Sequence, residues 1–198
     1  MRRGPGDDTN IGTHEAHVDY VTRKFTGILI ALSHARNVIP KGTLKCIVEA
    51  LVMSIVRYCL SVYGSCGTTQ IRRVQKIVNF CVRVVTGKRR YDRGVTRACT
   101  LLRWLSAEQL VAYHTACALG RIIVSEQPSY LYSTIGPRAR QRHAYETRQS
   151  GLLSLPNIRT EAGRRRLCNR GVTLLNRMGA EPGEPGFRRR VKRVAMQL

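Results

Sequence analysis

Apolar residues recur at three- and four-residue steps through most of the first 135 residues, and this spacing places them on one face of an α-helix. The alternation of apolar and polar residues that is typical of strands is rare before residue 140. The pattern therefore predicts an all-α fold, a multi-helix bundle followed by an irregular, Arg-rich C-terminal segment.

One helix is predicted more clearly than the others. It begins near Ile71 and ends at Gly87, because glycine is common just after the last helical residue. Thr68 or Thr69 is its expected N-cap. Its apolar face consists of Ile71, Val74, Val78, Cys81, Val82 and Val85.

Further helices are expected on both sides of this one. The first covers about 14–37, with Thr13 as its cap, and a long apolar helix follows Pro40 and ends at Gly64. Others are expected at 95–103, 106–126, 161–177 and 187–198, with a short element from Pro128. The expected core includes Trp104, then Ile47, Leu51, Ser54, Ile55 and Tyr58 of the second helix, and Leu110, Tyr113, Cys117, Leu119, Ile122 and Val124 of the helix over 106–126.

The composition changes along the chain suggest four segments. Residues 1–12 form a disordered start and 13–135 a helical bundle. Residues 136–178 form a basic segment of extended chain and short helix, because Gly, Pro and Arg replace the helical periodicity. Residues 179–198 form a Pro/Gly/Glu linker and a basic C-terminal helix.

The charge balance points to a polyanionic partner. The chain has 34 Lys and Arg against 12 Asp and Glu, for a net charge of +22. Such an excess repels itself in a compact chain and favours nucleic acid, and Arg suits planar contact with phosphates. Residues 1–135 and residues 136–198 each carry a net charge of +11, so the C-terminal third is the more densely cationic.

The seven cysteines and the start of the chain favour an intracellular protein. The cysteine number is odd, no C-x-x-C occurs, and several thiols lie on apolar helix faces, which is typical of reduced, buried thiols. Residues 1–10 lack the apolar stretch of a secretory signal. The apolar run 44–63 is interrupted by Lys45, Glu49 and Arg57, so we expect a buried helix and no membrane span. A nuclear or cytoplasmic protein that is not secreted is expected.

The residues that enzymes use do not assemble into a catalytic motif. The acidic residues are scattered, and neither a phosphate-binding glycine loop nor a nucleophile motif occurs. Gly6-Asp7-Asp8 lacks the apolar strands that would hold a metal-binding pair, and His14-x-x-His17 lacks further ligands. No catalytic residue, metal site or cofactor is therefore predicted.

Cationic residues on the clearest helix are the predicted nucleic-acid contacts. Arg72, Lys76 and Arg83 share a face away from the apolar stripe, and Lys88, Arg89 and Arg90 follow Gly87 directly. In the C-terminal segment, Tyr145 lies between His143 and Arg148 and is the better candidate for stacking on an unpaired base. The predicted binding set is Arg72, Arg73, Lys76, Arg83, Lys88, Arg89, Arg90, His143, Tyr145 and Arg148.

Four local patterns, in order along the chain, resemble the region after the polymerase domain in non-LTR (LINE-type) retrotransposon reverse transcriptases of the kind abundant in arthropod genomes. The chain departs from the family in having Tyr63 and Leu175 where the family has Trp, and in lacking Leu-Pro after Arg177. The resemblance covers about 15–178. The patterns are His17-Val18-Asp19-Tyr20 with Lys24; Val56-Arg57-Tyr58 through Val62-Tyr63-Gly64; Ile71-Arg72-Arg73-Val74-Gln75-Lys76 through Val85-Thr86-Gly87; and His143-x-Tyr145-x-Thr147-Arg148 with Leu155-Pro156 and Arg170-Gly171-Val172 up to Asn176.

The resemblance implies a non-catalytic piece of an RNA-directed DNA polymerase. The catalytic aspartates of the family precede the matching region, so no catalytic residue carries over. The implied role is to hold template RNA or an RNA/DNA primer duplex, with the missing palm domain as a further partner. Three alternatives stay open: an unrelated basic, ribosome-associated RNA-binding protein, an enzyme in its own right, and a decayed element without present function.

Overall fold

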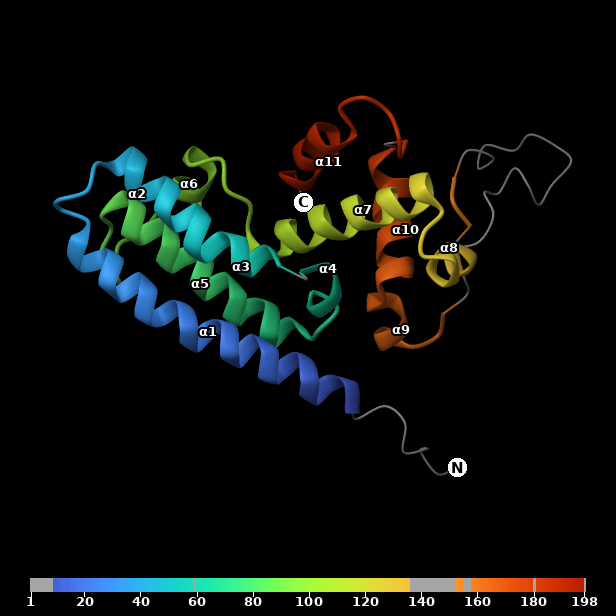
Figure 1. The fold of residues 1–198 in the computed structure, drawn as a ribbon, viewed down its shortest axis with the longest axis horizontal. Coiled ribbons are helices and arrows are strands. Elements are labelled where there is room, and N and C mark those ends of the chain that lie inside the picture. The colour runs from blue at the N-terminus through green and yellow to red at the C-terminus, as the bar shows by residue number, and fades with distance from the viewer. Residues whose placement is uncertain (1–8, 59, 136–151, 155–157, 180, 198) are drawn as a thin grey trace, which may run out of the picture. The chain divides into compact units, whose positions relative to one another are not determined.

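Helices account for nearly all of the structure in the computed structural model, which describes residues 9–58, 60–135, 152–154, 158–179 and 181–197 (Figure 1). No strand occurs among these residues, so the predicted all-α fold is confirmed. The chain divides into two compact units, Met1–Glu108 and Gln109–Leu198. The predicted segment boundary at 135/136 lies inside the second unit.

Two long helices that run in the same direction form the centre of the first unit. Helix α1 (Thr9–Ala35) lies beside α5 (Thr68–Thr86), as Figure 1 shows. Two predictions for α1 are wrong, because it begins at Thr9: Thr13 lies inside the helix and does not cap it, and residues 9–12 are helical. Helix α5 also packs against α2 (Lys41–Val48) and α6 (Val95–Leu101). The apolar residues buried on the two long helices are Val18, Val21, Phe25 and Leu29 of α1, and Ile71, Val74, Ile77, Val78, Cys81, Val82, Val84 and Val85 of α5.

The predicted long second helix is broken into four pieces. These are α2 (Lys41–Val48), a π-helical turn at Glu49–Met53, α3 (Ser54–Arg57) and, after an extended Tyr58, α4 (Leu60–Tyr63). The hydroxyl of Tyr63 donates to the carbonyl of Val56 and connects the two sides of the break.

The predicted core face of this second segment is also wrong. Leu51 is 48% exposed, Tyr58 is 68% exposed and Ser54 is exposed, whereas Ile47 and Ile55 are half-buried. A segment that is apolar on several sides does not reveal which side faces the core. The π-helical turn has more residues per turn than an α-helix, so residues spaced by four stay on one side of the segment. The residues buried instead are Leu44, Val48, Val52, Met53, Val56 and Leu60.

Helix α5 ends where predicted and begins differently. Gly87 adopts a left-handed φ of 75°, which ends the helix, but Gly67 is the N-cap and neither Thr68 nor Thr69 caps it. The short helix α6 (Val95–Leu101) then packs against α5. Trp104 is buried as predicted, and its indole N–H donates to the Glu49 carboxylate.

The second unit contains most of α7 (Ala107–Ser125) together with α8 (Ser129–Ile135), α9 (Glu161–Arg165), α10 (Leu167–Met178) and α11 (Phe187–Ala195). Of the predicted core residues in α7, Leu110, Leu119 and Ile122 are buried, whereas Val124 is 60% exposed. Gly171 of α10 lies directly against Leu119 of α7, because a Cβ at this position would be only 2.8 Å from Leu119 Cδ2. The core of this unit is Ala116, Leu119, Ile122, Ile135, Cys168, Val172, Leu175, Met178 and Val191.

The predicted helix over 161–177 is two helices. Thr160 caps α9 by accepting from the Gly163 N–H, and Arg166, with ψ 146°, separates α9 from α10. The Asn176 side chain both donates to and accepts from the backbone of Leu153 at 2.9 Å, so it fixes the segment before these helices.

Candidate nucleic-acid interface

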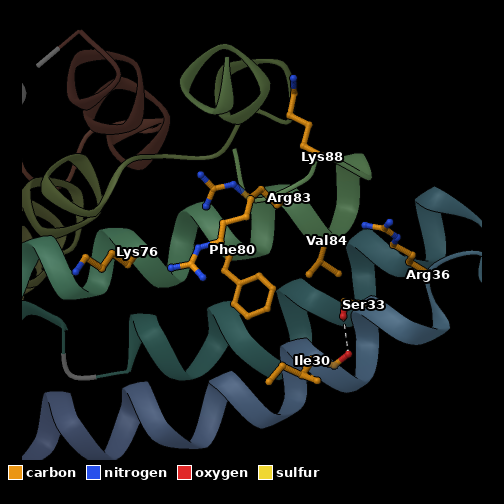
Figure 2. A pocket seen from close by; sticks show the side chains of 9 residues that line it. Ile30, Ser33, Arg36, Lys76, Phe80, Arg83, Val84 and Lys88 are labelled. Atoms are coloured by element: carbon orange, nitrogen blue, oxygen red, sulfur yellow. Dashed lines mark hydrogen bonds between the residues drawn. The ribbon is translucent and has the colours of Figure 1, made fainter. Parts of the chain in front are cut away.

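The predicted cationic face of α5 borders a pocket. Phe80 lies four residues after Lys76, and Arg83 and Val84 lie three and four residues after Phe80, so these side chains share one side of the helix (Figure 2). Ile30 and Ser33 of α1, with Arg36 just after it, approach from the neighbouring helix. Lys88 and Arg90 complete the lining from the turn after Gly87. We call this site the α1–α5 pocket; its volume is about 520 Å³.

The α1–α5 pocket is strongly cationic. Five of its nine lining residues are Lys or Arg, and none is acidic. The positive potentials of such a cluster add up, and a concave surface focuses them, so the pocket attracts anions. Among the described residues, no acceptor lies within hydrogen-bond distance of Arg83 Nε, although this atom is buried. The lining cations are Arg36, Lys76, Arg83, Lys88 and Arg90.

Four carboxylates of the first unit have side chains that the structure describes, and three of them contact other groups. Glu49 lies 4.0 Å from the Lys45 ammonium and accepts from Trp104. Asp92 accepts from the backbone N–H of Arg89 at 2.7 Å. Glu108 is exposed and does not line the pocket. The fourth, Asp19, pairs with Arg73.

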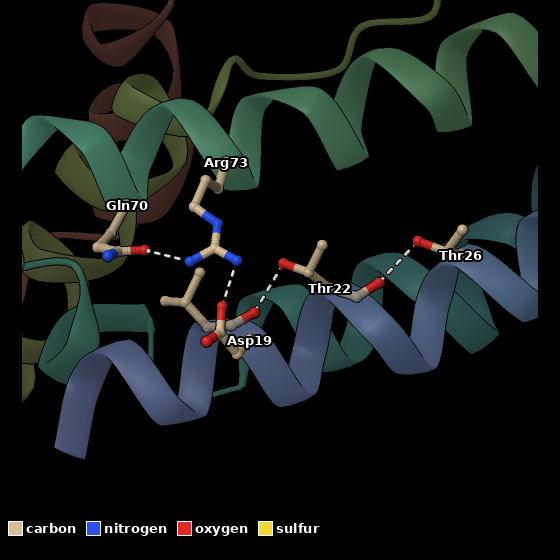
Figure 3. A network of polar contacts seen from close by, with 6 residues as sticks. Asp19, Thr22, Thr26, Gln70 and Arg73 are labelled. Carbon is tan, nitrogen blue, oxygen red and sulfur yellow. Dashed lines mark hydrogen bonds and ion pairs between the residues drawn. The ribbon is translucent and has the colours of Figure 1, made fainter. Parts of the chain in front are cut away.

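Arg73 has a structural role at the contact between α1 and α5. Figure 3 shows its guanidinium between the Asp19 carboxylate of α1, with which it forms an ion pair, and the Gln70 side chain, to which it donates at 3.2 Å. Nearby on α1, Thr22 and Thr26 donate to carbonyls four residues earlier. The ion pair holds Arg73 in place between the two helices.

The turn after α5 has a fixed shape because of two glycines and two polar contacts. Gly87 and Gly94 adopt left-handed φ angles of 75° and 79°, which other residues adopt at a cost. Between them, the Lys88 ammonium donates to the Arg93 carbonyl at 3.0 Å, and Asp92 holds the Arg89 backbone. Arg90 lies 5.9 Å from the Tyr91 ring centroid.

The structure therefore separates the predicted binding residues into groups. Lys76, Arg83, Lys88 and Arg90 come together around the α1–α5 pocket. Arg72 and Arg89 are exposed but do not line it, and Arg73 pairs with Asp19. His143, Tyr145 and Arg148 lie outside the described residues.

Sequence reasoning missed five residues of the site, the fifth being Val84 of α5. Arg36 and Ser33 come from the end of another helix, and no local pattern connects them to α5. Ile30 is 45% exposed and falls outside the apolar stripe of its helix. Phe80 could have been found, because an aromatic residue four positions after Lys76 interrupts the polar face of α5.

A second cationic surface belongs to α11. Val191 belongs to the core of the second unit, Ala195 is also buried, and the remaining positions are mostly basic. A shallow pocket beside this helix includes Arg121 and Glu184, and the Glu184 carboxylate lies 2.9 Å from Arg190. The exposed cations of α11 are Arg188, Arg189, Arg190, Lys192 and Arg193.

Within the described part of the chain, no group of three His, Cys, Asp or Glu side chains is placed to hold a metal ion. In the same part, no helix has the length and apolar character needed to cross a membrane. Comparison with known proteins identified no relative: no family model, curated protein or solved structure matches the chain significantly.

Proposed function

We propose that this chain is a non-catalytic, thumb- or linker-like region of a non-LTR retrotransposon reverse transcriptase, and that it holds template RNA or primer duplex by its phosphates. The observation that carries the binding proposal is the α1–α5 pocket, where five cations converge without a carboxylate. Phosphate contacts of this kind position a nucleic acid without reading its sequence.

The resemblance gains support from where its motif residues lie. The His17 ring of the first motif packs at a tilt of 51° against the Tyr63 ring of the second, with ring centroids 5.1 Å apart. Asp19 of the first motif pairs with Arg73 of the third. Gln75 of the third accepts from the Ala107 N–H at 2.7 Å and so caps α7. Motifs whose residues contact one another are expected if they were selected together as parts of one fold.

The salt dependence of RNA binding tests this proposal. Each phosphate contact that a cation makes adds about 0.9 to the slope of log affinity against log salt. Replacing Lys76 and Arg90 by Ala should therefore lower that slope by about 2 and weaken binding by about 10- to 100-fold. Fluorescence anisotropy with a labelled RNA hairpin over a salt titration measures both.

The matched control removes two other cations of the same unit. Arg23 and Arg97 are exposed and do not line the pocket. Replacing both by Ala removes the same charge and should change affinity by less than about threefold, since distant charges are screened. Equal losses in the two double variants, or RNA binding that is absent at low salt in the unmodified chain, would contradict the proposal.

The proposal also assigns no polymerase activity to this chain. Purified protein with Mg²⁺, deoxynucleotides and a primed template should incorporate no nucleotide. Robust incorporation that survives further purification would overturn this part.

A further inference from the structure

Phe80 lies outside the fully buried core of the first unit, with part of its ring open to the pocket. The α5 residues that face α1 are buried, whereas Phe80 is only partly buried, on the side of Lys76 and Arg83. Exposing an aromatic ring to water on a charged helix face costs free energy that a polar residue would not. Its position in the α1–α5 pocket indicates a ligand that covers the ring.

The pocket has an apolar part next to its cations. Ile30, Phe80 and Val84 contribute the apolar side chains, and Ile30 is 45% exposed although it is a large hydrophobic residue. The five cations described above line the same pocket. A ligand that fits must therefore present a flat or apolar part and at least one negative charge within about 520 Å³, a size in the range of roughly 300–1,000 Å³ typical of small-molecule sites.

An unpaired nucleotide has both parts. Its base can cover the Phe80 ring and the neighbouring aliphatic side chains, while its phosphates contact the surrounding cations. The Arg83 guanidinium, which lines the pocket, supplies N–H donors for a base or phosphate oxygen. A base inside a duplex is stacked between its neighbours and cannot present its face to Phe80.

We infer that the α1–α5 pocket binds one unpaired nucleotide of a single-stranded RNA, with the base against Phe80 and the flanking phosphates on Lys76, Arg83 and Arg90. This inference rests on the proposed function, because it specifies which part of the held nucleic acid enters the pocket. A duplex is held by the cations alone, so the pocket discriminates between single-stranded and paired segments.

Abasic RNA tests the inference separately from phosphate binding. A short oligouridine and an abasic strand of equal length carry the same phosphates and differ only in their bases. Anisotropy titrations of the full chain at low salt should show about tenfold tighter binding of the oligouridine, since stacking of one base on an aromatic ring supplies an effect of this order.

Substitutions at Phe80 assign that difference to the ring. Phe80→Leu keeps an apolar side chain and should fold normally, yet the oligouridine should then bind at most about threefold more tightly than the abasic strand. Phe80→Tyr keeps an aromatic ring and should retain the full, about tenfold, difference. Tyr58→Ala is the control, because Tyr58 is 68% exposed and does not line the pocket. It should leave the ratio unchanged.

The outcomes are distinguishable. Tight and equal binding of both strands, or a full ratio in Phe80→Leu, overturns the inference and leaves the proposed function standing. If the unmodified chain binds neither strand at low salt, the proposed function itself is contradicted. A ratio that depends on the aromatic ring at position 80 supports the inference.

Discussion

Cationic side chains converge in the first unit and spread over a helix surface in the second. Around the α1–α5 pocket, cations from α5, from the turn after it and from the residue after α1 line one space, and no carboxylate lines it. On α11, by contrast, five consecutive or near-consecutive cations are exposed, and Glu184 pairs with Arg190. The C-terminal third has the higher charge density, yet the concave anion site lies in the first unit. Convergence of chain segments, and not charge density, distinguishes the candidate site.

The largest expected effect comes from removing cations in matched sets. The triple change Arg36→Ala, Lys76→Ala and Arg90→Ala should weaken RNA binding by about 100-fold or more, because several phosphate contacts are lost together. The α11 triple Arg189→Ala, Lys192→Ala and Arg193→Ala removes the same charge and should cost about threefold, a general electrostatic effect. Anisotropy at one salt concentration compares them, and a larger loss in the α11 triple would reverse the comparison.

Local patterns predicted much of the fold and only part of the site. The helical spacing of α5 and the glycine at its end were read correctly, because both are properties of a short stretch of sequence. The buried face of the broken second helix cannot be predicted in this way, because it depends on the helices that cover it. The sequence pattern groups Arg73 with the binding cations, although its partner Asp19 lies 54 positions earlier on another helix. Contacts between distant segments decide which cations remain available, and periodicity does not report them.

A substitution in the second unit should affect stability without affecting the pocket. Gly171→Val would push a side chain into Leu119, which is fully buried and cannot move aside. Overpacking of this kind costs about 2 kcal/mol of unfolding free energy. Urea unfolding measures the loss, and RNA affinity at low temperature should change by less than about twofold. Stability equal to that of the unmodified chain would show that α7 and α10 approach less closely than described.

A glycine at the edge of the pocket should affect both properties. No atom lies within 4 Å of a Cβ placed on Gly87, so Gly87→Ala tests the left-handed φ of 75° alone. The expected cost is about 1–2 kcal/mol, and RNA affinity should fall several-fold because the turn carrying Lys88 and Arg90 shifts. Gly186→Ala is the matched control in the second unit: its φ is 87°, nothing crowds it, and RNA affinity should not change.

The smallest effects concern the buried thiols, which report on each unit separately. Burial raises the pKa of the Cys81 thiol to about 12, and burial also raises the pKa of Cys168. Because the folded state favours the neutral thiol, this contribution to stability is complete below pH 9 and is lost as the pH rises toward 12.

At mildly alkaline pH, iodoacetamide should modify the exposed Cys46 first and leave Cys81 unmodified in the folded chain. Mass spectrometry of tryptic peptides checks the order; early modification of Cys81 would contradict its burial.

Photocrosslinking of bound RNA tests the central claim most directly, since it reports which residues the nucleic acid touches. A single-stranded RNA with 4-thiouridine at one position is bound to the full chain at low salt, irradiated, and mapped by mass spectrometry. The α1–α5 pocket predicts crosslinks in the segments around Ile30–Arg36 and Lys76–Arg90, with loss of these crosslinks in Phe80→Leu. Crosslinks confined to α11, with none in the pocket segments, would contradict the account.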